Sequence, residues 1–95
     1  MAELQKIIKV PLTKKEIEDK LNKISELTYN GKYFYYTDTI EDDAGYITGD
    51  FTIAIYPFNH KIVLKIDTED FERGQKQQAK EELDSYAMFL KDSLK

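Results

Sequence analysis

The stretch "FTIAIYPFNHKIVLKI", residues 51–66, decides the fold because two runs of alternating apolar residues flank a short turn. The apolar members are Phe51, Ile53 and Ile55 in the first run and Ile62, Leu64 and Ile66 in the second. Alternation with a period of two is typical of β-strands that bury one face. Pro57 and Asn59 between the runs are turn formers. We therefore expect an antiparallel hairpin whose Ile-rich face lies on the core.

A third strand is expected at residues 33–40, joined to Ile47 and its successors by the acidic turn "EDDAG", residues 41–45. Two registers are open for this strand. In the preferred one the core-facing residues are Phe34, Tyr36 and Ile40, with Asp38 on the same face near a strand end or bulge where water reaches it. The alternative buries Tyr33 and Tyr35 instead. The first buries more apolar surface, so we expect it.

The segment before these strands predicts a strand and then a helix. Residues 5–12 have strand character, and Pro11 marks an end or an edge position. Thr13 and Glu16 have the spacing of a capping box, which predicts a helix start at Thr13. An apolar stripe then continues to residues 27–28, and Asn30 with Gly31 supplies a stop.

The last element is a helix that Asp67 or Thr68 is expected to cap, with an acidic first turn. Its apolar stripe comprises Ala79, Leu83, Tyr86, Ala87, Leu90 and Leu94. Gly74 weakens the beginning, so the first turn is a candidate for a separate piece. The order strand, helix, three strands, helix predicts one α+β domain over residues 1–95, a two-layer sandwich with a mostly antiparallel sheet and both helices on one face.

Composition bounds the function without naming it. The chain of 95 residues has no Cys and 41% apolar content, which fits one domain, requires no oxidising compartment and excludes thiolate chemistry. No apolar run approaches the ~18 residues of a membrane span, and the N-terminus lacks a signal-peptide core. We expect a cytoplasmic protein with no membrane contact. Nearly all of the net charge of −4 comes from residues 33–60, which contain five acids and no Lys or Arg.

In the preferred register the outer sheet face carries tyrosines and threonines beside an acidic rim. Tyr and Thr are strong strand formers and turn carboxylates aid solubility, so a purely structural role is one interpretation. The other is a contact surface for a basic partner protein, in a small interaction or inhibitor module such as a phage or mobile-element antagonist of a nucleic-acid-binding protein. The predicted contact anchors are Tyr33, Tyr35 and Tyr56, and the predicted steering charges are Asp42, Asp43 and Asp50.

Helix, three antiparallel strands and helix is also the element order of the double-stranded RNA-binding domain. The stretch "GQKQQAK", residues 74–80, resembles the basic start of that family's last helix, with Lys76 and Lys80 at matching spacing. The likeness implies a degenerate nucleic-acid binder as the alternative function. It departs from the family at Gln77, where a second adjacent Lys is expected, and in the acidic turn that replaces the minor-groove loop. We therefore expect nucleic acid not to be the partner.

Catalysis and cofactor binding have little support in the sequence. The single His, His60, falls in a turn and is expected to be solvated. Asp38 and Asp50 are the one candidate carboxylate pair, if they face each other across the hairpin. The acidic turn lacks the spacing of a calcium loop, and zinc ligands are missing. We expect no enzyme and no cofactor or metal, and a homodimer through Phe71 and Phe89 stays possible.

Overall fold

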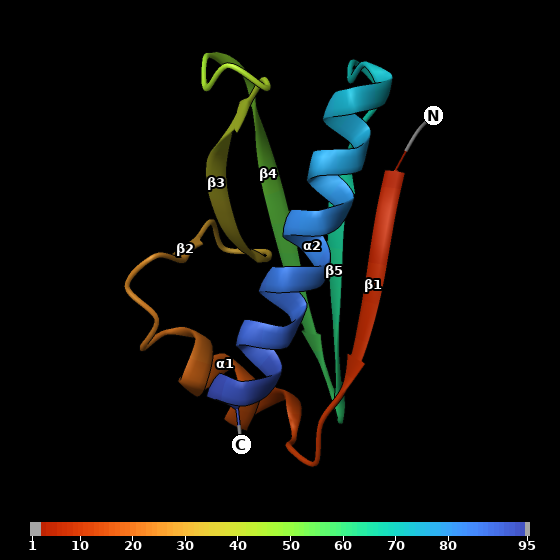
Figure 1. Ribbon diagram of the computed structural model, residues 1–95. Coiled ribbons are helices and arrows are strands. Elements are labelled where there is room, and N and C mark those ends of the chain that lie inside the picture. Colours follow the sequence, from red (N-terminus) through yellow and green to blue (C-terminus); the bar gives the residue numbers. More distant parts are fainter. Residues whose placement is uncertain (1–2, 95) are drawn as a thin grey trace.

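The computed structural model describes residues 3–94 and shows a five-stranded sheet with two helices (Figure 1). The elements are β1 (Glu3–Lys9), α1 (Lys14–Leu21), β2 (Thr28–Tyr29), β3 (Phe34–Glu41), β4 (Ile47–Phe58), β5 (Lys61–Asp67) and α2 (Arg73–Ser93). Across the sheet the strands lie in the order β1-β5-β4-β3-β2, and every neighbouring pair is antiparallel. The predicted α+β class and element order are confirmed, with the two-residue β2 as an addition. Among the described residues, no helix combines the length and apolar character needed to cross a membrane.

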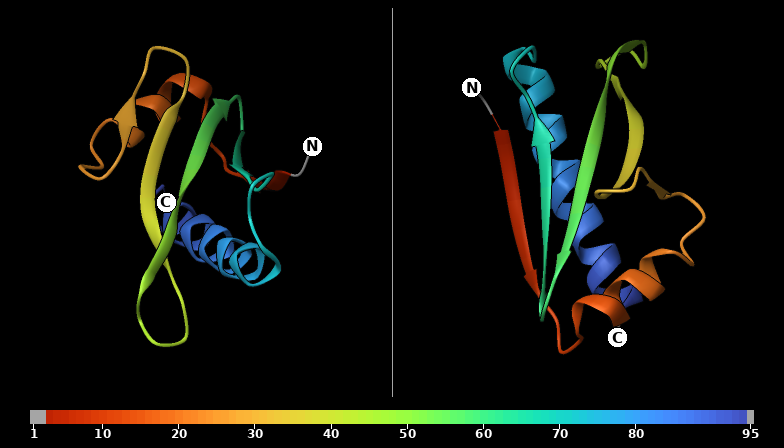
Figure 2. Two further views of the ribbon diagram at one scale, coloured as in Figure 1. Left: turned by 90° about the horizontal axis from the view of Figure 1, so that it is seen from above. Right: turned by 180° about the vertical axis from the view of Figure 1, so that it is seen from behind.

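Two layers enclose one core. Helix α2 lies across the sheet and α1 sits at its lower end (Figure 1), and from behind the sheet stands in front of α2 (Figure 2). One buried cluster joins the sheet to both helices; its fully buried members include Ile17, Leu21, Ile53, Ile55, Ile62, Leu64, Ile66 and Leu90. Burial of each such side chain stabilises the fold by about 1.5–3 kcal/mol. The alternating residues of the central hairpin thus supply most of the inner sheet face.

The preferred register of β3 is confirmed. Phe34 and Ile40 are buried, and the Tyr36 ring stacks on the Tyr86 ring of α2 with centroids 4.9 Å apart. Asp38 shares this face, is exposed, and accepts a hydrogen bond of 2.8 Å from the Tyr36 hydroxyl. Its position differs from the expectation in one respect. Asp38 lies inside the strand, and the bulge follows between Ile40 and Glu41.

The β4–β5 turn consists of Asn59 and His60 and also anchors the β1–α1 connection. His60 is exposed, as predicted, and adopts a left-handed backbone with φ of 65°. Its N–H donates to the Leu12 carbonyl at 2.8 Å. The Asn59 side-chain oxygen accepts the Lys14 N–H at 2.9 Å, at the first residue of α1. The strong turn residues of the central hairpin therefore fix where α1 begins.

Helix α1 begins as predicted and ends early. Thr13 and Glu16 form the capping box, but the helix stops at Leu21, so the expectation that it continues to residues 27–28 was wrong. The chain then makes two successive four-residue turns. In the first the Ile24 N–H donates to the Leu21 carbonyl, and in the second the Leu27 N–H donates to the Ile24 carbonyl. Ile24 and Leu27 still pack against the core. Their burial explains the apolar stripe without a helix.

The start of α2 also differs from its prediction. Asp67 and Thr68 do not cap the helix; the Asp67 carboxylate accepts the Glu69 N–H, and the buried Thr68 accepts the Phe71 N–H through its carbonyl. The helix begins at Arg73, with Glu72 as the N-cap and no acidic residue in its first turn. The predicted separate piece before Gly74 is therefore a turn at residues 68–71.

Candidate functional site

The turn between β3 and β4 is built by Asp42. Its N–H donates to the Tyr46 carbonyl at 2.8 Å, and its Oδ1 accepts the N–H groups of Ala44 and Tyr46, each at 2.9 Å. Gly45 supplies the left-handed conformation, with φ of 86°, that a side chain would strain. The carboxylate of Asp43 makes no hydrogen bond with residues 3–94 and is exposed. Asp42 thus holds the turn, and Asp43 is free to contact another molecule.

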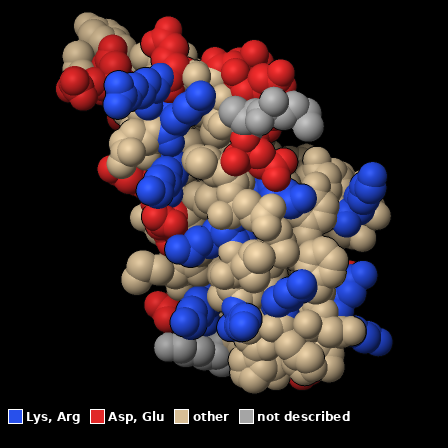
Figure 3. Space-filling view, turned by 90° about the vertical axis from the view of Figure 1, so that its right-hand side faces the viewer, with Lys and Arg blue, Asp and Glu red and all other residues tan. Residues whose placement is uncertain are grey.

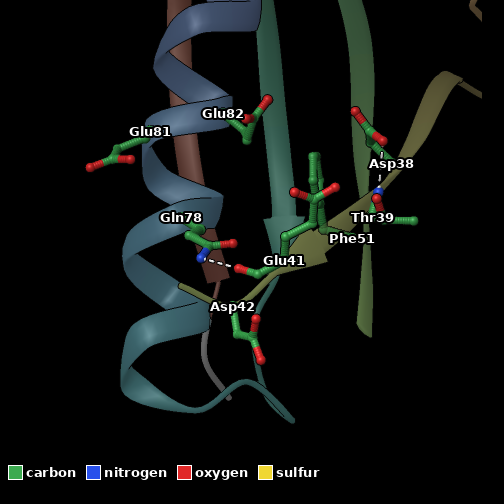
Figure 4. A pocket seen from close by; sticks show the side chains of 8 residues that line it. All are labelled: Asp38, Thr39, Glu41, Asp42, Phe51, Gln78, Glu81 and Glu82. Atoms are coloured by element: carbon green, nitrogen blue, oxygen red, sulfur yellow. Dashed lines mark hydrogen bonds between the residues drawn. The ribbon is translucent and has the colours of Figure 1, made fainter. Parts of the chain in front are cut away.

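An open hollow of about 400 Å³ lies between β3 and α2 (Figure 4). Its lining includes five carboxylates, those of Asp38, Glu41, Asp42, Glu81 and Glu82. The side chain of Gln78 on α2 donates a hydrogen bond to the Glu41 carbonyl and links helix to strand beside the hollow. Two regular elements therefore hold acidic side chains on opposite walls of one groove.

Two smaller hollows extend this acidic region. One, of about 220 Å³, shares Glu41, Asp42 and Gln78 with the first, and the other, of about 210 Å³, shares Phe51. Ten carboxylates line the three hollows: Asp38, Glu41, Asp42, Asp43, Asp50, Asp67, Asp70, Glu72, Glu81 and Glu82. Among residues 3–94, no Lys or Arg lines any of the three hollows. We name these ten residues the acidic end; grouped charges of one sign create an extended negative potential.

The predicted tyrosine anchors lie together, away from the acidic turn, on the sheet face that Asp50 also shares. The rings of Tyr33 and Tyr56 are 4.8 Å apart, and that of Tyr35 meets Tyr33 at 6.4 Å. The Lys65 ammonium lies 5.4 Å from the centre of the Tyr56 ring. Burial raises the pKa of Tyr56 above its ordinary value of 10. The neighbours of the tyrosines thus include Lys65 and, paired with it at 4.0 Å, the Glu3 carboxylate, which is not one of the ten residues of the acidic end.

The structure therefore divides the six candidate residues into two groups. Asp42, Asp43 and Asp50 belong to the acidic end, whereas the three tyrosines lie toward the far end of the sheet. Asp50 and Tyr56 are six residues apart on β4, which corresponds to ~20 Å along an extended strand. Sequence reasoning missed the contribution of α2. The adjacent Glu81 and Glu82 were a visible signal, but their approach to β3 depends on how the helix crosses the sheet.

The two residues of the candidate carboxylate pair point to opposite faces of the β3–β4 hairpin. Asp38 is opposite Phe51 and Asp50 is opposite Thr39. Since neighbouring residues of a strand point to opposite faces, these two carboxylates do not face one another. Within residues 3–94 no three His, Cys, Asp or Glu side chains are placed to hold a metal ion. Lys76 and Lys80 are exposed on α2.

The two aromatic residues considered for dimerisation differ in burial. Phe71 is half-buried and packs against the core. Phe89 is 42% exposed and its ring lies 5.3 Å from that of Tyr86.

Comparisons of this chain with protein-family models, with curated proteins and with solved structures give no match.

Proposed function

We propose that this chain is a cytoplasmic, non-enzymatic interaction module whose acidic end binds a basic surface of a partner protein. One observation carries the proposal: ten carboxylates from β3, β4, β5, α2 and their connections line three hollows, and no Lys or Arg of the described part of the chain lines them. Holding like charges together costs stability through repulsion. Binding of a cationic surface relieves that repulsion, so the release of this repulsive free energy contributes to the affinity.

The geometry suits recognition by charge more than by shape. The largest hollow is open, and its walls stand on β3 and α2, so partner Lys or Arg side chains can enter between Asp38 and Glu82 with little rearrangement. Complementary potentials accelerate association and select against acidic partners. If the basic surface of the partner normally binds nucleic acid, the module acts as a competitive inhibitor. Tyr33, Tyr35 and Tyr56 lie farther along the sheet, so we assign the steering of the partner to the carboxylates alone.

The test compares charge reversals inside and outside the acidic end. Asp43→Lys and Glu82→Lys are suitable because neither carboxylate makes a side-chain hydrogen bond or ion pair with residues 3–94. Asp42 is unsuitable because its carboxylate holds the turn. The matched control is Asp19→Lys, an equal charge change on the exposed surface of α1. Each protein is titrated with a lysine-rich peptide and followed by NMR of its backbone amides.

We expect the peptide to shift the amides of residues 38–43 and 78–82 in the wild type. Each reversal at the acidic end should weaken binding roughly two- to five-fold, which corresponds to ~0.5–1 kcal/mol for an exposed charge pair. Asp19→Lys should have no comparable effect. Equal loss in all three variants would mean that net charge alone attracts the peptide, and would contradict a specific acidic surface. Steeply salt-dependent binding to duplex RNA, measured in parallel, would favour the nucleic-acid alternative.

A further inference from the structure

Strand β1 forms an edge of the sheet, and its outer side pairs with no other strand among residues 3–94. It is paired with β5 alone, from Glu3 opposite Asp67 to Lys9 opposite Lys61. A free edge of this kind presents unpaired N–H and C=O groups that can accept another strand. On this side of the molecule, Lys and Arg side chains spread over most of the face, and Asp and Glu are densest at its upper end (Figure 3).

Along β1, residues that bond to β5 alternate with residues whose backbone groups point outward. The Val10 N–H donates to the His60 carbonyl at 3.1 Å, and Val10 and His60 continue the register of the β1–β5 pair. Hydrogen-bonded positions alternate along an antiparallel pair. The even-numbered residues of β1 therefore bond to β5. The odd-numbered residues, Glu3, Gln5, Ile7 and Lys9, point their N–H and C=O groups outward.

We infer that the free edge of β1 binds the β1 strand of a second copy of this chain, antiparallel across a two-fold axis at Lys6. In this register Glu3 lies opposite Lys9 of the second copy, and Lys9 opposite its Glu3. Gln5 then pairs with Ile7, so every outward-pointing backbone group of the strand finds a partner. The register joins the two sheets into one and matches opposite charges at both ends of the seam, where Lys9 of the second copy would add to the pair that Glu3 makes with Lys65 of its own chain at 4.0 Å.

Side chains beside the edge favour the same occupant. Between β1 and α2 lies a hollow of about 300 Å³ whose lining combines the apolar Ile7 and Met88, 51% and 69% exposed, with three lysines, Lys6, Lys9 and Lys91. A second copy would cover both apolar side chains. The two-fold axis brings two Lys6 side chains together, but each Lys6 ammonium already lies 3.3 Å from the Asp84 carboxylate of its own chain. The central repulsion is thus compensated within each copy.

The opposite side of the sheet does not offer a comparable seam. β2 covers only Phe34 and Tyr35 of β3, and the remaining edge of β3 carries Asp38 and Glu41, which line the acidic hollow. A second copy placed there would bring like charges together. Self-association is therefore favoured at β1 and opposed at β3.

The test is a charge swap read by sedimentation equilibrium from micromolar to millimolar concentration. Glu3→Lys places two Lys–Lys pairs in the seam, and Lys9→Glu places two Glu–Glu pairs there. Each single variant should weaken dimerisation roughly ten-fold. The double variant, Glu3→Lys with Lys9→Glu, should restore it, and so should an equimolar mixture of the two single variants. Glu3→Lys also breaks the ion pair with Lys65 of the same chain, whereas Lys9→Glu replaces a like-charged neighbour of Lys61 with a carboxylate. Loss of dimer in Lys9→Glu therefore does not arise from a broken ion pair within the chain.

A proline variant tests the backbone separately. Ile7→Pro removes an outward-pointing N–H that has no partner in β5, so the fold should be retained, as circular dichroism would show, while the dimer is lost. Three results would each overturn the proposal: a wild type that stays monomeric at millimolar concentration, a dimer that the single variants leave unchanged, or a double variant no stronger than the singles. The first would leave the edge to a strand of another protein.

Discussion

Replacing Tyr86 by Phe should stabilise the protein. The Tyr86 hydroxyl is buried and has no hydrogen-bond partner among residues 3–94. Burial is also the main cause that raises the pKa of this hydroxyl above its ordinary value of 10. A buried polar group without a partner costs about 1–3 kcal/mol. Phe keeps the ring that stacks on Tyr36 at 4.9 Å and contacts Phe89 at 5.3 Å, and discards only the uncompensated oxygen.

We expect the free energy of unfolding to rise by about 1 kcal/mol, at the low end of that range because neighbouring side chains relax. For a domain of this size the corresponding rise in Tm is roughly 4–8 °C. Urea and thermal unfolding followed by circular dichroism measure both quantities. An unchanged denaturant slope would confirm that stability, rather than the compactness of the unfolded chain, has changed.

Tyr36→Phe is the matched control because it removes the same atom from the other ring of the stacked pair. The Tyr36 hydroxyl donates to the Asp38 carboxylate at 2.8 Å, so its loss should lower stability by about 0.5–1.5 kcal/mol. The two substitutions should therefore act in opposite directions. If Tyr86→Phe lowers stability as much as Tyr36→Phe does, the Tyr86 hydroxyl makes a favourable interaction and the reasoning from its burial is wrong.

Three further predictions concern alkaline pH, the first helix and the core. The hydrogen bond to Asp38 is the main cause that raises the pKa of Tyr36 to about 12. The folded state therefore retains a proton that the unfolded state releases near pH 10, so the free energy of unfolding should fall as pH rises from 10 toward 12. Asp38→Asn should reduce that loss when urea unfolding is compared across this pH range. Thr13→Ala removes the N-cap of α1 and should cost about 1 kcal/mol by urea unfolding, with no change if the cap is dispensable. Ile53→Ala, at a fully buried position in β4, should cost about 2–5 kcal/mol, and a cost below about 1 kcal/mol would contradict the tight packing of this site.

The central strands could be predicted because their apolar residues alternate with a period of two, and one of the two registers buries more apolar surface. Alternation from Phe34 to Ile66 fixed which face is buried, and a shift by one residue would expose Phe34 and Ile40. The end of α1 could not be read in the same way. Ile24 and Leu27 have helical spacing, but two tight turns bury them against the core as well. Tyr29 then belongs to β2 and pairs with Phe34 of β3.

The acidic end was only partly visible because its members come from four elements that meet in space. Asp42 and Asp43 share a turn with a plain sequence signal. Glu81 and Glu82 are distant in the chain, and their approach to Glu41 depends on the angle at which α2 crosses the sheet. The distance between the tyrosine anchors and the acidic end could not be predicted for a related reason. Alternation places Tyr35 and Asp50 on one face but says nothing about their separation along a long hairpin.

The two proposals constrain each other through the direction of β1. This strand starts with Glu3 near the acidic end and runs away from it, because Glu3 lies opposite Asp67 of β5. An antiparallel partner strand reverses that direction, so a dimer through β1 would place its two acidic ends at opposite extremes of a longer sheet. Their mutual repulsion would be small at that separation, since exposed charges are screened beyond ~10 Å at moderate salt. Such a dimer would present two acidic ends that face apart. This arrangement suits the binding of two separate basic partner molecules better than the binding of one.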